Sequence, residues 1–442
     1  MRERGAAPID PALLAPVLRP LAAGAAGGAA ARTLPGTAYA SAELFAWERR
    51  HFVEGSWFCV GRSADLGTAG DQRAVSVGTV SVLLVRDDTG VLRGFFNVCR
   101  HRGHELLEPG TGRTARGIKC PYHGWVYGLA GECRATPRFS KDSATKDGAA
   151  NDGAGATKDG AGGGPGATAG GPDGIAAGGV DRAEFPLLGV RTAEWHGWVF
   201  VNVSGDAPPF AAHIGNADQV VADYQPARLL AGAASEYEIA ANWKLVIENY
   251  LECYHCPTIH PELCRVTAVE SGPGYPEPAT GLWVGGPLPL RDHAETMSLT
   301  GQSLGVPIRT VPAARRRTVG YAALLPNLLV SPHPDYVMTH RLVPLGPDRT
   351  KVECAWLFPP EAFDRPGFSP DYAARFWDLT NRQDWAACES VQRNAASPGF
   401  RPGPISPWES DVWWEMAVVA RGYLDGRLAP LPLPVDGRSP AR

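Results

Sequence analysis

The chain has 442 residues, of which 44% are apolar and 20% are charged, as in an ordinary globular protein with room for two hydrophobic cores. Its net charge of −4 gives no reason to expect binding to nucleic acid or to an anionic membrane surface. The sequence has no run of about 18 consecutive apolar residues, so it does not predict a membrane span. Nine cysteines, an odd number in a chain too large to need disulfides, favour a reducing compartment, the cytoplasm, in which some cysteines bind metal.

The first half of the chain begins with a polar and small-residue segment and continues as short strands. Residues 1–38 are rich in Ala, Gly and Pro, and we expect them to form a flexible leader that is poorly ordered except where it touches the body of the protein. Alternating apolar residues then predict a β-rich segment. Its expected strands are 74–86 and 91–98 around a turn at Asp87–Gly90, and 124–127 and 132–135 around a turn at Gly128–Gly131.

A low-complexity stretch interrupts this β-rich segment. From about 140 to 179 the chain is almost wholly Ala, Gly, Asp, Lys, Thr and Pro, and ATKDGA occurs twice. Without large apolar residues such a stretch cannot offset the entropy of ordering, so it predicts a disordered insert. A strand pattern resumes at 198–203. The insert therefore lies inside a first domain, 39–206.

The remaining residues, 207–442, predict a second domain of the α+β class. Strand-like runs grouped together and bracketed by helices favour an antiparallel sheet covered by helices. The expected helices are Asn242–Cys256, Asp371–Arg393 and Ser410–Leu424, and the expected strands are Val319–Val330, Tyr336–Leu342 and Thr350–Phe358.

A first set of metal ligands lies in two loops of the first domain. Cys99-x-His101 is followed, after 18 intervening residues, by Cys120-x-x-His123. Two thiolates suit one iron of a [2Fe–2S] cluster and two imidazoles suit the other. A structural zinc site could use the same four ligands, but zinc fingers pair Cys with Cys and His with His. The mixed loops, with their flanking Arg-Gly and Pro-Tyr-His-Gly-Trp sequences, therefore predict a Rieske-type cluster.

A second set of ligands lies at a predicted helix end. His255 and His260 form a His-x₄-His pair, and Pro257 disrupts the helix so that both histidines can face one point. Glu252, three residues before His255, is expected on the same helix face. Cys253, Cys256 and Cys264 crowd this segment, and we interpret them as small apolar fillers rather than ligands.

Two histidines need one carboxylate to complete the facial triad of a non-haem Fe(II) site. Asp384 lies on a mostly apolar face of the predicted helix at 371–393, where a charge needs a partner. The alternative interpretation is a surface pair of Asp384 with Arg382. Glu389 and Asp378 are the second choices as ligand.

These motifs, in this order, resemble the α subunits of Rieske ring-hydroxylating oxygenases. The resemblance covers the chain from about Pro35 onward, apart from the insert. It implies an all-β Rieske [2Fe–2S] domain followed by a helix-grip catalytic domain with a mononuclear iron. It also implies a homotrimer in which the cluster of one subunit reduces the iron of its neighbour through Glu252. The implied ligands are Cys99, His101, Cys120 and His123 for the cluster, and His255, His260 and Asp384 for the iron.

Glu252 also bears on the substrate. Aromatic-ring dioxygenases of the family usually have Asp at this position, whereas Glu252–Cys256 resembles the branch that acts on quaternary ammonium compounds such as glycine betaine, carnitine and stachydrine. The resemblance implies hydroxylation of an N-methyl group with O₂, after which the product collapses to the demethylated amine and formaldehyde. An aromatic-ring or aromatic-acid hydroxylase is the alternative. A cationic substrate favours an aromatic pocket; Trp283 and Tyr321 are available, but the sequence assigns neither.

The electrons must come from another protein. The sequence has no flavin or nicotinamide fingerprint and no plant-type ferredoxin cysteine run. We therefore expect a separate flavin and iron–sulfur reductase, with NAD(P)H acting only through it. A pure electron-transfer protein is a remote alternative, because it leaves the second domain and its triad without a role.

Overall fold

The computed structural model describes residues 9–22, 28–139, 180–270 and 274–431. The insert predicted at about 140–179 lies outside the described residues. The chain divides into two compact units: a smaller one made of 66–76 and 81–190, and a larger one that takes the rest. The predicted boundaries, 39–206 and 207–442, differ from this division and stay a prediction. In the described part of the chain, no helix combines the length and apolar character needed to cross a membrane.

The smaller unit is built of short strands. A seven-stranded sheet has the order β2-β11-β10-β5-β4-β3-β6, and β7, β8 and β9 form a second sheet. By residue number, β2, β11 and most of β10 belong to the larger unit, and the other strands belong wholly or mostly to the smaller one. The strand predicted at 74–86 is wrong in extent: the structure breaks it into two strands at Gly78, whose φ of +60° makes a turn that other residues rarely adopt. The strands are β2 (Phe58–Arg62), β3 (Asp71–Val77), β4 (Val80–Arg86), β5 (Leu92–Phe96), β6 (Gly110–Arg113), β7 (Ile118–Lys119), β8 (Val126–Tyr127), β9 (Cys133–Ala135), β10 (Gly189–Trp195) and β11 (Trp198–Asn202).

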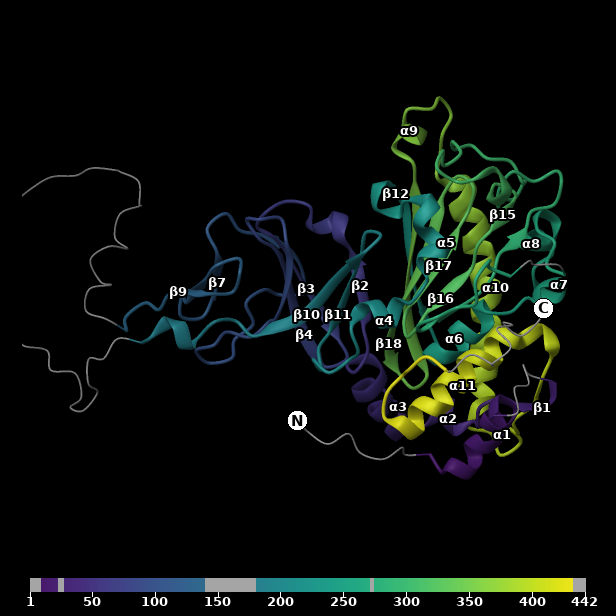
Figure 1. Cartoon of the computed structure of the whole chain (residues 1–442), viewed down its shortest axis with the longest axis horizontal. Coiled ribbons are helices and arrows are strands. Elements are labelled where there is room, and N and C mark those ends of the chain that lie inside the picture. The colour runs from purple at the N-terminus through teal and green to yellow at the C-terminus, as the bar shows by residue number, and fades with distance from the viewer. Residues whose placement is uncertain (1–8, 23–27, 140–179, 271–273, 432–442) are drawn as a thin grey trace, which may run out of the picture. The chain divides into compact units, whose positions relative to one another are not determined.

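The larger unit contains a six-stranded antiparallel sheet with the order β12-β19-β18-β17-β16-β13. Helices α6, α10 and α11 lie side by side against it (Figure 1). Buried and partly exposed residues alternate along most of β19, because one face of the sheet meets these helices. The elements are β12 (Leu230–Ile239), β13 (Trp283–Val284), β16 (Ala322–Leu324), β17 (Leu328–Pro332), β18 (Val337–Gly346), β19 (Arg349–Phe358), α6 (Trp243–Tyr250), α10 (Asp371–Ala395) and α11 (Ser410–Asp425).

Two predicted elements of this unit are shorter than expected. The strand predicted at 319–330 is three strands, because the chain turns after β15 and again after β16. The helix predicted at Asn242–Cys256 ends at Tyr250 and gives way to a turn before α7. The remaining short elements are α2 (Thr37–Ala40), α3 (Ala42–Glu48), α4 (Phe210–Ile214), α5 (Asp218–Val221), α7 (Cys256–Ile259), α8 (Pro261–Val266), α9 (Pro360–Phe363), β14 (Leu288–Pro289), β15 (Thr318–Val319) and β20 (Pro404–Ile405).

The prediction of a flexible leader is wrong for the described residues near the N-terminus, which form a helix and a strand. Helix α1 (Pro11–Ala22) packs against α11, and β1 (Gly28–Arg32) pairs with β20. Leu14 and Val17, three residues apart on one helix face, are fully buried in the core of the larger unit. The small-residue composition concealed two apolar side chains that gain burial only against a distant helix.

Two candidate metal centres

Two loops of the smaller unit share one backbone geometry. In each loop the cysteine N–H donates to the carbonyl five residues ahead, and its carbonyl accepts from a glycine four residues ahead. Both glycines have positive φ, +76° and +74°, a conformation that other side chains resist. The bonds join Cys99 to His104 (2.8 Å) and Gly103 (3.0 Å), and Cys120 to Trp125 (2.8 Å) and Gly124 (3.1 Å). The repeated Cys-x-His-x-Gly and Cys-x-x-His-Gly sequences therefore fold as matching loops.

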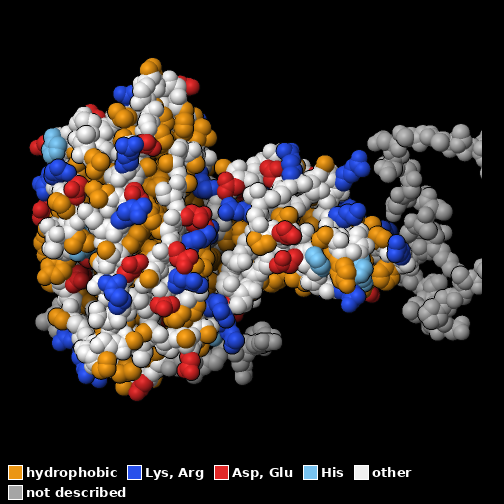
Figure 2. All heavy atoms as spheres, turned by 180° about the vertical axis from the view of Figure 1, so that it is seen from behind, with side chains coloured by type: hydrophobic (Ala, Val, Ile, Leu, Met, Phe, Trp, Pro, Cys, Tyr) orange, Lys and Arg blue, Asp and Glu red, His pale blue; other side chains and the backbone are white. Residues whose placement is uncertain are grey.

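The four predicted cluster ligands sort by type. The thiols of Cys99 and Cys120 are buried, and Tyr127 Oη lies 3.2 Å from Cys99 Sγ. Burial raises the pKa of the Cys120 thiol, and the neighbouring Cys99 thiol raises that pKa further. The imidazoles of His101 and His123 meet nearer the surface, with their Nδ1 atoms 3.2 Å apart. Figure 2 shows histidine side chains at the surface of this unit.

This arrangement fits a two-iron cluster better than one zinc ion. Four ligands around a single tetrahedral zinc lie within about 4 Å of one another. Among the described residues, the one group of three or more donor atoms gathered within 4.8 Å is in the other unit, so these four atoms are not gathered around one point. Two thiols in the interior and two imidazoles toward solvent are the donor set of a Rieske cluster.

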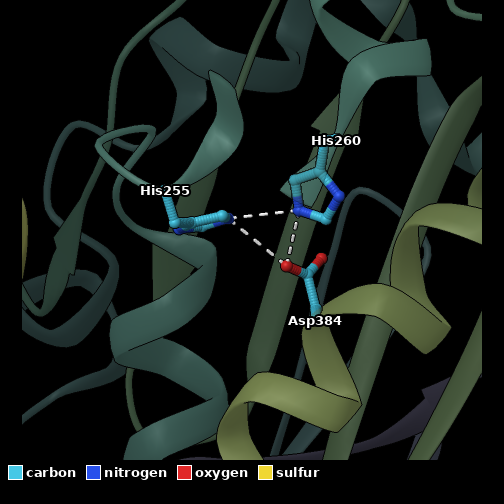
Figure 3. Close-up of side chains that lie close together, drawn as sticks. All are labelled: His255, His260 and Asp384. Carbon is cyan, nitrogen blue, oxygen red and sulfur yellow. Dashed lines mark hydrogen bonds and ion pairs between the residues drawn. The ribbon is translucent and has the colours of Figure 1, made fainter. Parts of the chain in front are cut away.

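The second centre brings together three predicted ligands from two parts of the larger unit (Figure 3). His255 and His260 stand at the two ends of α7, and Asp384 projects from α10. Their Nε2 atoms are 3.2 Å apart, and Asp384 Oδ1 lies 2.7 Å from His260 Nε2 and 3.3 Å from His255 Nε2. Two imidazoles and one carboxylate on one side of a metal form a facial triad that suits Fe(II).

Each imidazole is oriented through its other nitrogen. Glu252 hydrogen-bonds Nδ1 of His255 and accepts from its backbone N–H at 3.1 Å. Gln383 Oε1 lies 2.8 Å from His260 Nδ1. With Nδ1 held as donor, Nε2 of each ring is left as the metal-binding atom.

Sequence reasoning was partly wrong about Glu252 and missed Gln383. Glu252 reaches His255 across the turn that follows α6, not along a shared helix face. Gln383 had one weak signal, its place beside Asp384, but nothing in the sequence told which way its side chain points.

The alternative acids lie elsewhere. Asp378 accepts from the hydroxyl of Tyr237 at 2.6 Å and pairs with Arg382 at 2.9 Å. Glu389 accepts from a backbone N–H at 3.1 Å. Arg382 therefore pairs with Asp378, one turn earlier on α10, and not with Asp384, which contacts the histidines.

The triad is electrostatically coupled. Burial lowers the pKa of His255, but hydrogen bonds and charge from Asp384 and Glu252 outweigh burial and raise that pKa to about 10. Burial raises the pKa of Asp384, but the two histidines outweigh burial and hold that pKa below its ordinary value. The carboxylate is therefore ionised, as a metal ligand must be.

A cavity of about 240 Å³ reaches Glu252, the hydrogen-bond partner of His255, although His255, His260 and Asp384 are not among its lining residues. Its wall includes Glu252 and Cys253, the aromatic side chains of Tyr250 and Tyr321, and Trp408. The two tyrosine rings lie 5.7 Å apart. Trp283, the other aromatic residue considered from the sequence, is buried in a separate cluster of the core.

Comparison with known proteins gives matches to both halves of the chain. A family model described as "Rieske [2Fe-2S] domain" matches residues 56–146, and one described as "Ring hydroxylating alpha subunit (catalytic domain)" matches 226–425. The predicted order of an all-β Rieske domain and an α+β catalytic domain is thereby confirmed.

Similar curated proteins include oxygenase subunits of two monooxygenases. The glycine betaine monooxygenase oxygenase subunit of Chromohalobacter salexigens is 28% identical over 401 residues, 85% of this chain and 82% of that protein. The carnitine monooxygenase oxygenase subunit of Escherichia coli K12 is 32% identical over 236 residues, 52% of each. These figures measure likeness of sequence.

Two solved structures share the fold. The quaternary ammonium Rieske monooxygenase CntA with L-carnitine has a TM-score of 0.66 at 21% identity, covering 89% of this chain and 96% of that one. Naphthalene 1,2-dioxygenase from Rhodococcus has a TM-score of 0.65 at 17% identity, covering 96% and 99%. Because enzymes with different substrates score alike, the fold does not choose the substrate.

Proposed function

The chain belongs to the α subunits of Rieske ring-hydroxylating oxygenases, and we propose that it hydroxylates an N-methyl group of a quaternary ammonium compound similar to glycine betaine. The reaction consumes O₂, two electrons and two protons, and gives one water and a hydroxymethyl amine. That product breaks its C–N bond to release the demethylated amine and formaldehyde.

The cavity beside Glu252 carries this proposal. A quaternary ammonium has no N–H to donate, so aromatic faces and nearby carboxylates are what recognise it. The hydroxyl of Tyr250 donates to Val330 O at 3.0 Å and that of Tyr321 contacts Met297 Sδ at 3.3 Å. With their polar ends engaged, the two rings turn apolar surface to the cavity, whose wall also includes Asp411.

The residues of the second centre divide the work. His255, His260 and Asp384 would hold Fe(II), which when bound supplies the site of oxygen reduction. Glu252 and Gln383 fix the two imidazoles, and Glu252 also lines the substrate cavity. One carboxylate therefore touches both the iron ligands and the space for substrate, so it can link substrate binding to electron arrival.

We assign electron supply to a separate flavin and iron–sulfur reductase. Cys99, His101, Cys120 and His123 would hold the [2Fe–2S] cluster that receives those electrons, and Glu252 would connect it to the iron of a neighbouring subunit in a homotrimer. Inter-subunit electron transfer is described for a quaternary ammonium Rieske monooxygenase of known structure. The nine cysteines are unpaired, which supports a cytoplasmic location.

The deciding experiment is a single turnover. The reduced protein, freed of reductant, is exposed to O₂ with glycine betaine, carnitine, stachydrine or a panel of aromatic acids. We expect formaldehyde with one ammonium compound, at a yield close to the iron content. Hydroxylated aromatic product without formaldehyde would replace this proposal by an aromatic hydroxylase.

A variant separates the two centres. His255→Ala removes an iron ligand from the larger unit, so turnover should fall to background while the visible spectrum of the cluster stays unchanged. Loss of that spectrum in a folded variant would contradict two independent centres, and retained turnover would exclude His255 as ligand.

A further inference from the structure

Two cysteines flank the iron ligand His255. Cys253 and Cys256 lie in the turn between α6 and α7, with their sulfur atoms 2.6 Å apart. The N–H of Cys256 donates to the carbonyl of Cys253 at 3.3 Å, so the four residues form a closed turn. The sequence interpretation as separate apolar fillers does not account for thiols held against each other.

The turn has the geometry of a disulfide that has not formed. A turn closed in this way brings its end Cα atoms within about 7 Å, and disulfides span about 4.4–6.8 Å. The sulfur atoms need to approach by about 0.6 Å to reach a bond length of about 2.05 Å. Both cysteines are free.

The pair is also placed where oxidants arise. Cys253 is partly exposed and lines the 240 Å³ cavity. Cys256 is buried, and its sulfur lies 3.9 Å from Nε2 of His255, the atom that faces the metal position. Among the residues that line this cavity Cys253 is the one cysteine, so an oxidant that enters the cavity can reach its thiol.

We propose that Cys253 and Cys256 are a dithiol modified by hydrogen peroxide, which converts it reversibly to a disulfide. One thiol cleaves the peroxide O–O bond to give a sulfenic acid and water; the second attacks that sulfur and expels a second water. The two thiols lose two electrons and two protons, and the peroxide gains them. The supply of peroxide within the protein, by reduction of oxygen without hydroxylation of a substrate, rests on the proposed function. The oxidation of the two cysteines by peroxide does not.

Alkylation mapping tests the proposal in the full-length protein with both metal centres. After stoichiometric peroxide and a catalase quench, the protein is denatured with iodoacetamide and digested with trypsin. One tryptic peptide, 245–265, contains Cys253, Cys256 and Cys264. We expect three alkyl groups on this peptide before peroxide and one afterwards, with three restored by prior treatment with dithiothreitol.

Single variants identify the pair. Cys264→Ser should still lose two alkyl groups, whereas Cys253→Ser and Cys256→Ser should not form the intramolecular bond. An unchanged urea-unfolding transition of the larger unit shows that each variant is folded. A wild-type peptide that keeps three alkyl groups, or that gains only sulfinic acid, overturns the proposal, as does loss of the bond in Cys264→Ser. Because the readout is alkylation, failure of the substrate assay leaves this result standing.

Discussion

At the scale of single residues, the histidines proposed as iron ligands have neighbours that orient their rings. The ring of His260 is 1% exposed and has Gln383 as the partner of its Nδ1. Such partners set which nitrogen carries the proton and hold the ring at a fixed angle to the metal. Gln383 is therefore a positioning residue for His260.

We expect Gln383→Ala to reduce iron affinity by about 10- to 100-fold, because His260 loses its fixed tautomer. Iron content after dialysis against a graded chelator measures the effect, and the adjacent surface variant Arg382→Ala is the matched control. Equal iron retention in both variants would mean that Asp384 alone orients His260.

The larger unit contains a buried cluster in which three glutamates surround one lysine. Lys244 pairs with Glu48 at 2.7 Å, and both are fully buried. Glu415 is fully buried as well, and neither of its carboxylate oxygens has a hydrogen-bond partner among the described residues. Burial, and then the charge of Glu248, raise the pKa of Glu415 well above its ordinary value. One cation cannot neutralise three acids, so burial favours the protonated forms of Glu415 and Glu248.

The raised pKa of Glu248 should make the stability of the protein depend on pH. Burial raises its pKa to about 7 against the opposing hydrogen bond from Tyr39 and charge of Lys244. The folded state binds this proton more tightly than the unfolded state, so its contribution to stability is complete below the ordinary pKa of 4.5 and is lost as pH rises through about 7. We expect Glu248→Gln to gain roughly 2 kcal/mol relative to wild type between pH 5 and pH 8.

Urea unfolding at pH 5 and at pH 8, monitored by a signal from the larger unit, measures that difference. Glu361→Gln, an exposed substitution of the same chemistry on α9, should show no such dependence. A pH-independent offset in Glu248→Gln would mean that Glu248 is ionised in the folded protein.

At the scale of elements, helix α1 is part of the core and not a leader. Leu14 is fully buried, whereas its neighbour Leu13 is 50% exposed. Removing the buried side chain leaves a cavity at the contact with α11, so we expect Leu14→Ala to cost about 2–5 kcal/mol in the free energy of unfolding. The same substitution at Leu13 should cost less than about 1 kcal/mol. Equal and small losses would return α1 to the status of a flexible leader.

The end of α6 shows the same dependence on context. Helical spacing placed Glu252 and His255 on one face, but the helix stops at Tyr250, where the hydroxyl of Tyr250 donates to Val330 on the sheet. The turn that follows lets Glu252, both flanking cysteines and His255 gather within a few residues. In a continued helix the side chains of Cys253 and Cys256 would project outward from one face, with their Cβ atoms about 5–6 Å apart.

At the scale of the whole molecule, electron flow between subunits has a sharp test. Cys99→Ser lacks the cluster and His255→Ala lacks the iron, so each is inactive alone. Co-expressed with different tags and purified through both, they form mixed oligomers. In a cyclic trimer with directional transfer, one of three subunit contacts joins an intact cluster to an intact iron, so we expect about one third of wild-type turnover per mixed trimer.

Absence of turnover in mixed oligomers whose metal contents match the two variants would exclude transfer between subunits. Light scattering on the same sample measures the oligomer size, and a dimer would change the expected fraction to about one half for directional transfer in both contacts.

The sequence alone determined which chemistry this protein carries. Cysteine and histidine at those spacings predict a two-iron cluster, and a His-x₄-His pair with a distant acid predicts a facial triad. Both predictions are possible because ligand type and local spacing can be read from short stretches of sequence. Tertiary structure decided the rest. The choice of Asp384 over Asp378 and Glu389, the partner Gln383, the end of α6, the burial of α1 and the meeting of Cys253 with Cys256 all depend on where side chains distant in sequence pack, and composition and periodicity do not encode those contacts.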